Sequence, residues 1–123
     1  MIILPFEPLQ LTRHGGAAIT LDNQYRLRVS AEAVRELKLS PYQYVIISVD
    51  VENKRIGLVK QELAKIPNAS AIKIDKRGYL GVKAGKEVTS KLALIDADLP
   101  LKFDDIGWID ASGTRWRAFQ ANN

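Results

Sequence analysis

Basic side chains placed between aliphatic ones give this 123-residue chain its clearest chemical potential, which is the binding of phosphate groups. In two segments a Lys or Arg alternates with Leu, Ile or Val, a pattern typical of half-buried strands whose polar side chains leave the core face. Outward strand positions and the turns between strands hold Arg26, Arg28, Lys73, Lys76 and Arg77. Such side chains can neutralise phosphates, and a two-stranded ribbon can enter the major groove. We therefore predict a DNA-binding surface built from these five residues.

The distribution of charge leaves two other interpretations open. The chain carries a net charge of +4, with seven basic and two acidic residues in 65–91 but five aspartates and three basic residues in 96–123. Basic side chains on strands also protect exposed edges from aggregation without any nucleic acid being bound. The aspartate-rich second half would repel phosphates and favours a protein-interaction module with a protein partner.

Four aromatic residues lie close to these segments. Tyr25 and Tyr79 fall at turns between strands, where their rings could stack on unpaired bases, so single-stranded nucleic acid is a further alternative. Trp108 and Trp116 fall on two strands of one predicted hairpin. We expect them to pack as a cross-strand pair or in the core.

The sequence offers little that would support catalysis. It has one histidine and no cysteine, so a metal site would have to be built from carboxylates, and the aspartates of 96–105 match no calcium-loop spacing. The "GYLG" segment from Gly78 to Gly81 lacks the third glycine and the long helix of a phosphate-binding motif. We predict a protein that is not an enzyme, with no cofactor and no metal.

An internal repeat organises the chain. Residues 18–31, "AITLDNQYRLRVSA", align without a gap to residues 71–84, "AIKIDKRGYLGVKA", at an offset of 53. The identical positions are Ala18/Ala71, Ile19/Ile72, Asp22/Asp75, Leu27/Leu80, Val29/Val82 and Ala31/Ala84. Shared strand alternation explains the aliphatic matches but not the aspartate in register. We predict repeat one over about 17–60, a connector over 61–70 and repeat two over about 71–120.

Each copy is predicted to contain a hairpin, a short helix and a second hairpin. Ser30 is a favourable N-cap for the first helix, and the apolar face of the second helix carries Ala84, Val88 and Leu92. The second hairpins are expected over 44–51 with 55–60 and over 106–110 with 115–119. A unit of about fifty residues buries little core alone. Two units in one chain should cover each other, so residues 1–123 are expected to form a single pseudo-symmetric domain that can still form a homodimer.

These patterns resemble the AbrB/SpoVT/MazE swapped-hairpin superfamily, in which a strand, a D-x-x-G-R turn, a second strand, a short helix ending in L-x-L and a hairpin follow one another. The first copy reads "DNQYR" over 22–26, with tyrosine at the glycine position. The second copy reads "DKRGY" over 75–79, with tyrosine at the arginine position. The helix N-cap, usually proline, is Ser30 in one copy and Lys83 in the other.

The resemblance implies both a fold and a function. Two copies in one chain are similar to the MraZ-like arrangement and imply a mostly β protein with two short helices, a tandem swapped-hairpin AbrB-like pseudo-dimeric β-barrel. The resemblance implies a transcription regulator that binds double-stranded DNA, with Arg26 at the arginine position of the family. An antitoxin-like module or inhibitor that binds a protein is the alternative within the same superfamily.

The N-terminal residues indicate in which cellular compartment the protein is expected. The stretch "MIILPFEPLQL" is apolar, but it lacks a basic start and is interrupted by prolines, so it does not resemble a signal peptide. No later apolar run is long enough to span a bilayer. We expect a cytoplasmic protein with no membrane partner.

Overall fold

The computed structural model describes residues 16–64, 66 and 69–122, and the N-terminal stretch just discussed lies outside this part. The strands are β1 (Ala18–Leu21), β2 (Leu27–Val29), β3 (Tyr44–Asp50), β4 (Arg55–Lys60), β5 (Ile72–Lys73), β6 (Leu101–Ala111) and β7 (Thr114–Asn122). The α-helices are α1 (Ala31–Glu36) and α2 (Val82–Lys91), and the 3-10 turns are η2 (Gln61–Leu63) and η3 (Asp96–Asp98). The prediction of a mostly β protein with two short helices is confirmed. Neither helix is long and apolar enough to cross a membrane, nor is any other helix in the described part.

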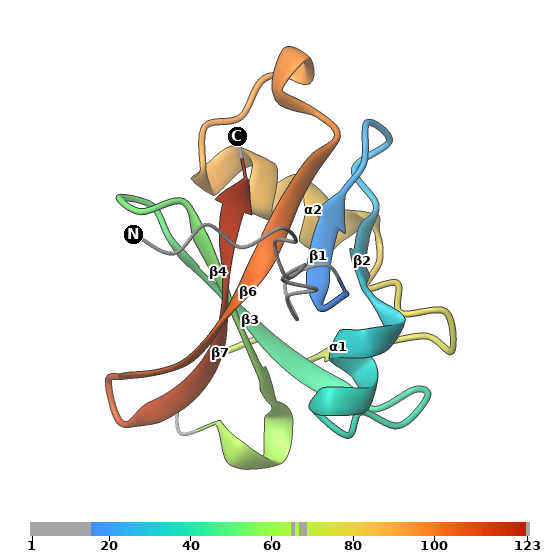
Figure 1. The fold of residues 1–123 in the computed structure, drawn as a ribbon, viewed down its shortest axis with the longest axis vertical. Coiled ribbons are helices and arrows are strands. Elements are labelled where there is room, and N and C mark those ends of the chain that lie inside the picture. The colour runs from blue at the N-terminus through green and yellow to red at the C-terminus, as the bar shows by residue number, and fades with distance from the viewer. Residues whose placement is uncertain (1–15, 65, 67–68, 123) are drawn as a thin grey trace, which may run out of the picture.

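All seven strands belong to one antiparallel sheet with the order β2-β1-β6-β7-β4-β3-β5. The sheet is curled into a half-barrel (Figure 1), and β2 and β5 are its two outer strands. The long hairpin β6–β7 lies near the middle of the strand order and has the longest run of paired residues in the sheet. Each neighbouring pair is antiparallel, which is compatible with the short turns in the sequence.

The first strand of each repeat pairs with the other repeat. In the first repeat, β1 pairs with β6 through registers such as Ile19 with Phe103. In the second repeat, β5 pairs with β3 through registers such as Ile72 with Val45. Strands β4 and β7 then pair with each other and join the two second hairpins. Because of these exchanges, neither repeat forms a sheet of its own.

Two backbone hydrogen bonds bring β2 against the residues that follow β5. The amide of Val29 donates to the carbonyl of Gly78 at 2.8 Å, and the amide of Leu80 donates to the carbonyl of Leu27 at 2.9 Å. Between them, Arg28 and Tyr79 form an isolated antiparallel bridge. We call this group of contacts the closing ladder, because it links the two ends of the curled sheet.

The second helix begins earlier than the sequence predicted. Gly81, and not Lys83, is its N-cap, and its φ of 91° is a conformation that glycine adopts readily. The chain therefore passes directly from the bridge at Tyr79 into α2. As a result Val82 starts a helix and is exposed, whereas its repeat partner Val29 ends a strand and is buried. The two copies share the aspartate turn, but the predicted first hairpin forms a strand pair only in the first copy, because the residues after the second turn pair with β2 instead of β5.

The first helix starts where it was predicted and is tied to the sheet at both ends. The hydroxyl of Ser30 accepts hydrogen bonds from the amides of Ala33, at 3.2 Å, and Ala18, at 3.0 Å. This N-cap therefore joins α1 to β1 as well as satisfying a free amide of the helix. Near the other end, Glu36 pairs at 3.1 Å with Arg117 of β7, which also binds Asp105 of β6.

The hairpin of the second repeat is longer than predicted. Strand β6 begins at Leu101, five residues before the expected start at 106, because its first residues pair with β1. The two tryptophans do not form a pair: Trp116 is buried, whereas Trp108 points to the opposite face and is 45% exposed. The ring of Trp108 instead has the guanidinium groups of Arg115 and Arg117 at 5.1 and 5.2 Å.

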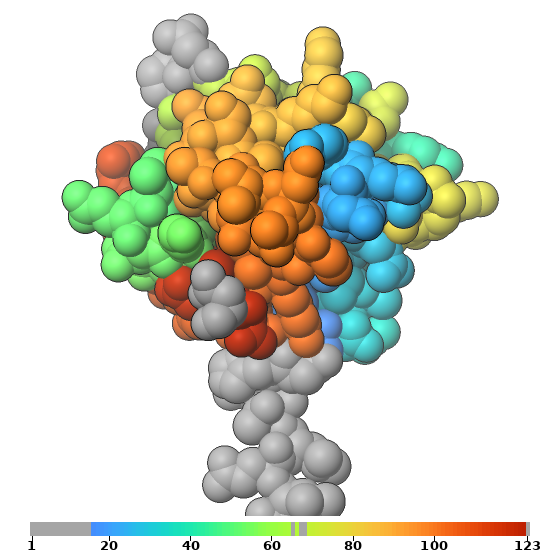
Figure 2. Space-filling model, turned by 90° about the horizontal axis from the view of Figure 1, so that it is seen from above, coloured from blue at the N-terminus to red at the C-terminus, as the bar shows by residue number. Residues whose placement is uncertain are grey.

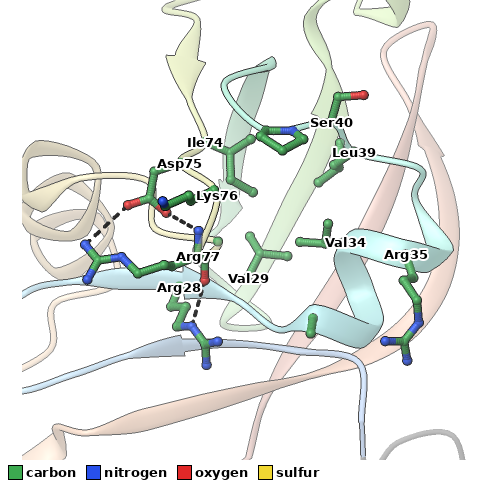
Figure 3. A pocket seen from close by; sticks show the side chains of 13 residues that line it. Arg28, Val29, Val34, Arg35, Leu39, Ser40, Ile74, Asp75, Lys76 and Arg77 are labelled. Atoms are coloured by element: carbon green, nitrogen blue, oxygen red, sulfur yellow. Dashed lines mark hydrogen bonds and ion pairs between the residues drawn. The ribbon is translucent and has the colours of Figure 1, made fainter.

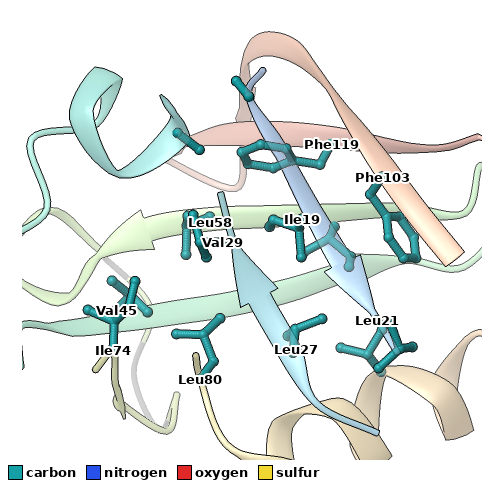
Figure 4. Close-up of a cluster of buried hydrophobic side chains, with 14 of the residues drawn as sticks. Ile19, Leu21, Leu27, Val29, Val45, Leu58, Ile74, Leu80, Phe103 and Phe119 are labelled. Carbon is teal, nitrogen blue, oxygen red and sulfur yellow. The ribbon is translucent and has the colours of Figure 1, made fainter. Parts of the chain in front are cut away.

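The hydrophobic core lies inside the curled sheet and draws on both repeats (Figure 4). Leu21 and Leu27 of the first hairpin and their repeat counterparts Ile74 and Leu80 are all buried. Phe103 and other long side chains of the second hairpins fill the space between them. Each fully buried side chain of this size contributes about 1.5–3 kcal/mol to the free energy of unfolding. The shared core is therefore the main reason why the repeats fold together.

We predict that Gly78→Ala lowers the free energy of unfolding by about 3 kcal/mol, measured by urea denaturation. Gly78 has a φ of 91°, and an added Cβ would lie 2.2 Å from the carbonyl oxygen of Val29 in the closing ladder. Gly113→Ala is the matched control, because Gly113 has a φ of 80° with nothing within 4 Å of an added Cβ. It should cost about 1 kcal/mol from strain alone. Equal losses in the two variants would contradict a close contact at the ladder.

Candidate nucleic-acid interface

The two repeats share one turn, which an aspartate holds in shape. Asp22 Oδ1 accepts hydrogen bonds from the backbone amides of Gln24 and Arg26, both at 2.9 Å. Asp75 Oδ1 accepts hydrogen bonds from the equivalent amides of the second copy, those of Arg77 at 2.8 Å and Tyr79 at 2.9 Å. The aspartate that matched in register therefore has the same role in both copies, and the prediction that these segments form similar turns is supported atom by atom. We call residues 22–26 the first tip and residues 75–79 the second tip.

The fourth residue of each tip adopts a left-handed conformation. Tyr25 has a φ of 63° and Gly78 a φ of 91°. Glycine takes this conformation at little cost, whereas tyrosine does so only where its surroundings compensate. Tyrosine in place of glycine therefore makes the backbone of the first tip more strained than that of the second. The first tip needs stabilising contacts to offset this strain.

The first tip has those contacts, because it packs against the second repeat. The hydroxyl of Tyr25 donates to Asp96 Oδ1 at 2.9 Å, and this hydrogen bond raises the pKa of the tyrosine. A Cβ on Gly85 of α2 would lie 1.9 Å from the carbonyl oxygen of Tyr25, so helix and tip are in close contact. Figure 2 shows the first tip, in blue, beside the orange segment that carries η3, while the yellow second tip projects at the side. The ring predicted to stack on bases is therefore half-buried and bonded within the protein.

Three guanidinium groups gather around the ring of Tyr79, the last residue of the second tip. Their Cζ atoms lie 5.6 Å (Arg26), 5.8 Å (Arg28) and 5.1 Å (Arg77) from the ring centroid. A cation within about 6 Å of an aromatic face is attracted by the ring quadrupole, which offsets part of the repulsion between the charges. With the exposed Lys76 of the same tip, these residues form what we call the basic patch, composed of Arg26, Arg28, Lys76 and Arg77.

Each arginine of the basic patch is oriented by one contact and keeps other N–H groups for a ligand. Arg26 Nε binds Asp22 Oδ2 at 2.7 Å, and Arg28 Nε donates to the carbonyl of Arg77 at 2.9 Å. Arg77 pairs more loosely with Asp75, at 3.6 Å, and its side chain is 71% exposed. A guanidinium has five N–H donors, so one or two internal bonds leave the fork able to contact a phosphate or a base edge.

The aspartates of the two tips are ionised more readily than ordinary carboxyl groups. Burial opposes the charge of Asp22, but hydrogen bonds from the amide and guanidinium of Arg26 outweigh it and lower its pKa. The amide of Tyr79 is the main cause of the lowered pKa of Asp75, with further help from Arg77. Both tips are therefore held by charged carboxylates at neutral pH. Asp22 in turn raises the pKa of Arg26 through their hydrogen bond.

A pocket of about 280 Å³ lies next to the basic patch. Figure 3 shows Arg28 and Arg77 on one side of it and Arg35, from α1, on the other. Its floor is apolar and includes Val34 and Ile74. Sequence reasoning missed Arg35, because nothing in the spacing of the chain indicates that α1 lies opposite the second tip.

One of the five predicted residues lies apart from the others. Lys73 is in β5, with its Nζ 5.7 Å from the centroid of the Tyr44 ring. It lines a groove beside α2 and not the pocket of Figure 3. The structure thus brings Arg26, Arg28, Lys76 and Arg77 together and leaves Lys73 on a neighbouring strand.

The aspartates of the second half are largely engaged within the protein. Asp98 accepts from the backbone amide of Ile95 at 2.8 Å, Asp104 lies 3.6 Å from Lys102, and Asp105 binds Arg117. With Asp96 bonded to Tyr25, four of the five have partners. Within the described residues, no three carboxylate or histidine side chains converge as a metal site would require.

Comparison of this chain with protein-family models, curated proteins and solved structures finds no match.

We predict that the stabilising effect of Asp75 depends on pH. Because its pKa is lower in the folded than in the unfolded chain, the ionised carboxylate stabilises the fold above the ordinary value of about 3.9, and this contribution is lost as the pH falls through the folded value. The difference in unfolding free energy between wild type and Asp75→Asn should be constant above about pH 5 and shrink below about pH 4. Urea denaturation at several pH values measures it, with the exposed Asp110→Asn as control for loss of one charge. A difference independent of pH would contradict the role of the charged carboxylate.

Proposed function

We propose that this chain is a non-enzymatic, cytoplasmic protein that binds double-stranded DNA, acting as a transcription regulator. The basic patch is the centre of the DNA-binding surface, and Lys73 contributes from its edge. No chemical step is assigned to the protein. Its role is to hold several cations in an arrangement that phosphates and base edges can recognise.

The observation that carries the proposal is the convergence of three guanidinium groups on one tyrosine ring. Asp22 and Asp75 pair with Arg26 and Arg77, but the four cations of the basic patch outnumber these two carboxylates, and the remaining positive charge favours an anionic partner. The arginines come from the first tip (Arg26), from β2 (Arg28) and from the second tip (Arg77), and hydrogen bonds of 2.7–2.9 Å hold Arg26 and Arg28 in place. Cations positioned in advance lose less conformational entropy on binding.

The exchange of strands between the repeats supports a resemblance to the AbrB-like swapped-hairpin superfamily. In a tandem swapped-hairpin body, each copy contributes its first hairpin to the other, and here β1 pairs with β6 while β5 pairs with β3. The common aspartate turn adds to this correspondence. We infer a pseudo-dimeric barrel of the AbrB type, formed by one chain as a single domain over residues 1–123, which the closing ladder completes.

The alternatives receive less support from the geometry. Four aspartates of the second half already have partners, which leaves fewer charges for a protein ligand of that region. Tyr25 is half-buried and bonded to Asp96, and three guanidinium groups lie within 6 Å of the centroid of the Tyr79 ring, so an unpaired base would compete with these contacts for either ring. Duplex DNA therefore fits the described surface better than a single strand.

We expect duplex binding that weakens steeply with salt, with a log–log slope of roughly −4 for four to five phosphate contacts at about −0.9 each. Lys76→Ala should flatten this slope by about one unit, because it removes one exposed cation without an internal bond. Fluorescence anisotropy of a labelled duplex at several salt concentrations measures both. Lys54→Gln, in the β3–β4 turn on the opposite side of Figure 1, is the control and should change neither affinity nor slope. If Lys54→Gln weakens binding as much as Lys76→Ala, only net charge matters and the site is wrong.

The separation of Lys73 from the basic patch gives a second expectation. Arg77→Ala should lower the affinity for duplex DNA about tenfold, since it removes a fork that is 71% exposed at the centre of the patch. Lys73→Ala removes the same formal charge from β5 and should lower the affinity by no more than about threefold, in keeping with a screened peripheral charge. The same anisotropy titration compares them. A larger loss in Lys73→Ala would move the centre of the interface toward α2.

A further inference from the structure

An open strand edge lies beside α2. Strand β5 pairs with β3 at Tyr44 and Val45 and extends no further along it. From Ile46 to Asp50, β3 pairs with β4 on one side, and none of the described residues pairs with its other side. The carbonyl of Gln43 accepts from Ile74 on that side at 2.9 Å. By the alternation of an antiparallel ladder, the backbone groups of Ile47 and Val49 point to the same side and are available to another strand.

A groove of about 850 Å³ runs along this edge. One wall is β3 from Ile47 to Val49, another is the face of α2 that carries Ala84 and Val88, and residues 69–73 line one end of the groove. The half-buried Ile47 and Val49 pack against the core from this side and give the groove an apolar floor. An extended segment laid here would gain backbone hydrogen bonds on one side and bury alternate side chains on the other.

The charges around the groove select the kind of segment that fits. Lys73, Lys83 and Lys91 line it, and Glu87 is the single acidic residue among the lining groups. All four side chains are exposed, so the rim is basic while the floor is apolar. Acidic side chains of a partner would be attracted to this rim, whereas a basic segment would be repelled.

We propose that this groove binds an extended peptide segment of a partner protein, in which acidic and β-branched side chains alternate, by adding it as a strand to the edge of β3. The β-branched side chains enter the groove between β3 and α2, and the acidic ones contact the lysine rim. This inference does not depend on the proposed binding of DNA, because the groove shares only Lys73 with the proposed DNA-binding surface and its other lining residues lie outside it.

The test is a selection of random eight-residue peptides displayed on phage against the full chain. We expect enriched sequences in which acidic and β-branched residues alternate and proline is absent from the centre. Synthetic copies should bind Lys83→Glu at least tenfold more weakly than wild type. Lys86→Glu makes the same change in net charge on the same helix and is the matched control. It should bind the peptides within about twofold of wild type, because Lys86 is not among the residues that line the groove.

A second measurement locates the bound peptide. Amide signals of Ile47 and Val49 should shift on titration in a 1H–15N NMR spectrum, and Val49→Pro, which removes a donor on the open edge, should abolish binding while the other signals keep their native dispersion. No enrichment, equal binding by Lys83→Glu and wild type, or shifts confined to the basic patch would overturn the proposal. So would a dimer of the free protein in sedimentation that Val49→Pro converts to a monomer, because the edge would then be occupied by a second copy of the chain.

Discussion

The structure depends on one constraint: the first strand of each repeat has its sheet partner in the other repeat. Strand β1 relies on β6, and β5 relies on β3. A backbone group left unpaired inside the core would cost as much as a lost hydrogen bond, so neither repeat can satisfy its own strands alone. The core follows the same arrangement, since Leu21 and Ile74 occupy equivalent buried positions from opposite repeats. Folding of one repeat is therefore conditional on the other.

The same constraint determines where the charged side chains meet. Arg28 and Tyr79 are 51 positions apart in the chain, and the closing ladder makes them direct neighbours. Arg28 is consequently placed by backbone hydrogen bonds between strands, while Arg26 and Arg77 lie in the two tips, whose shape Asp22 and Asp75 hold. A site supported by a ladder keeps its geometry better than one on a free turn. The fold and the proposed interface thus rest on the same few hydrogen bonds.

Local sequence patterns correctly predicted the features that depend on neighbouring residues in the chain, which are turns, a helix start and a hairpin. The aspartate in register identified the two tips, Ser30 identified the start of α1, and alternation identified the hairpin β3–β4. Features that depend on contacts between repeats were not predicted. The early start of α2 follows from a glycine at positive φ, and the extension of β6 follows from its pairing with β1. Arg35 joins the site because of how α1 packs, which residue spacing does not encode.

The unequal tips have a consequence for what a single chain can recognise. In an assembly of two identical chains, a tyrosine at the position of Tyr25 would occur twice, and both copies would need a partner such as Asp96. Here the repeats are covalently joined, so one tip can exchange glycine for tyrosine and become a packing element while the other keeps Gly78. Because the two copies are parts of one chain, they can carry different residues at equivalent positions. The surface around the two tips therefore has no internal two-fold equivalence.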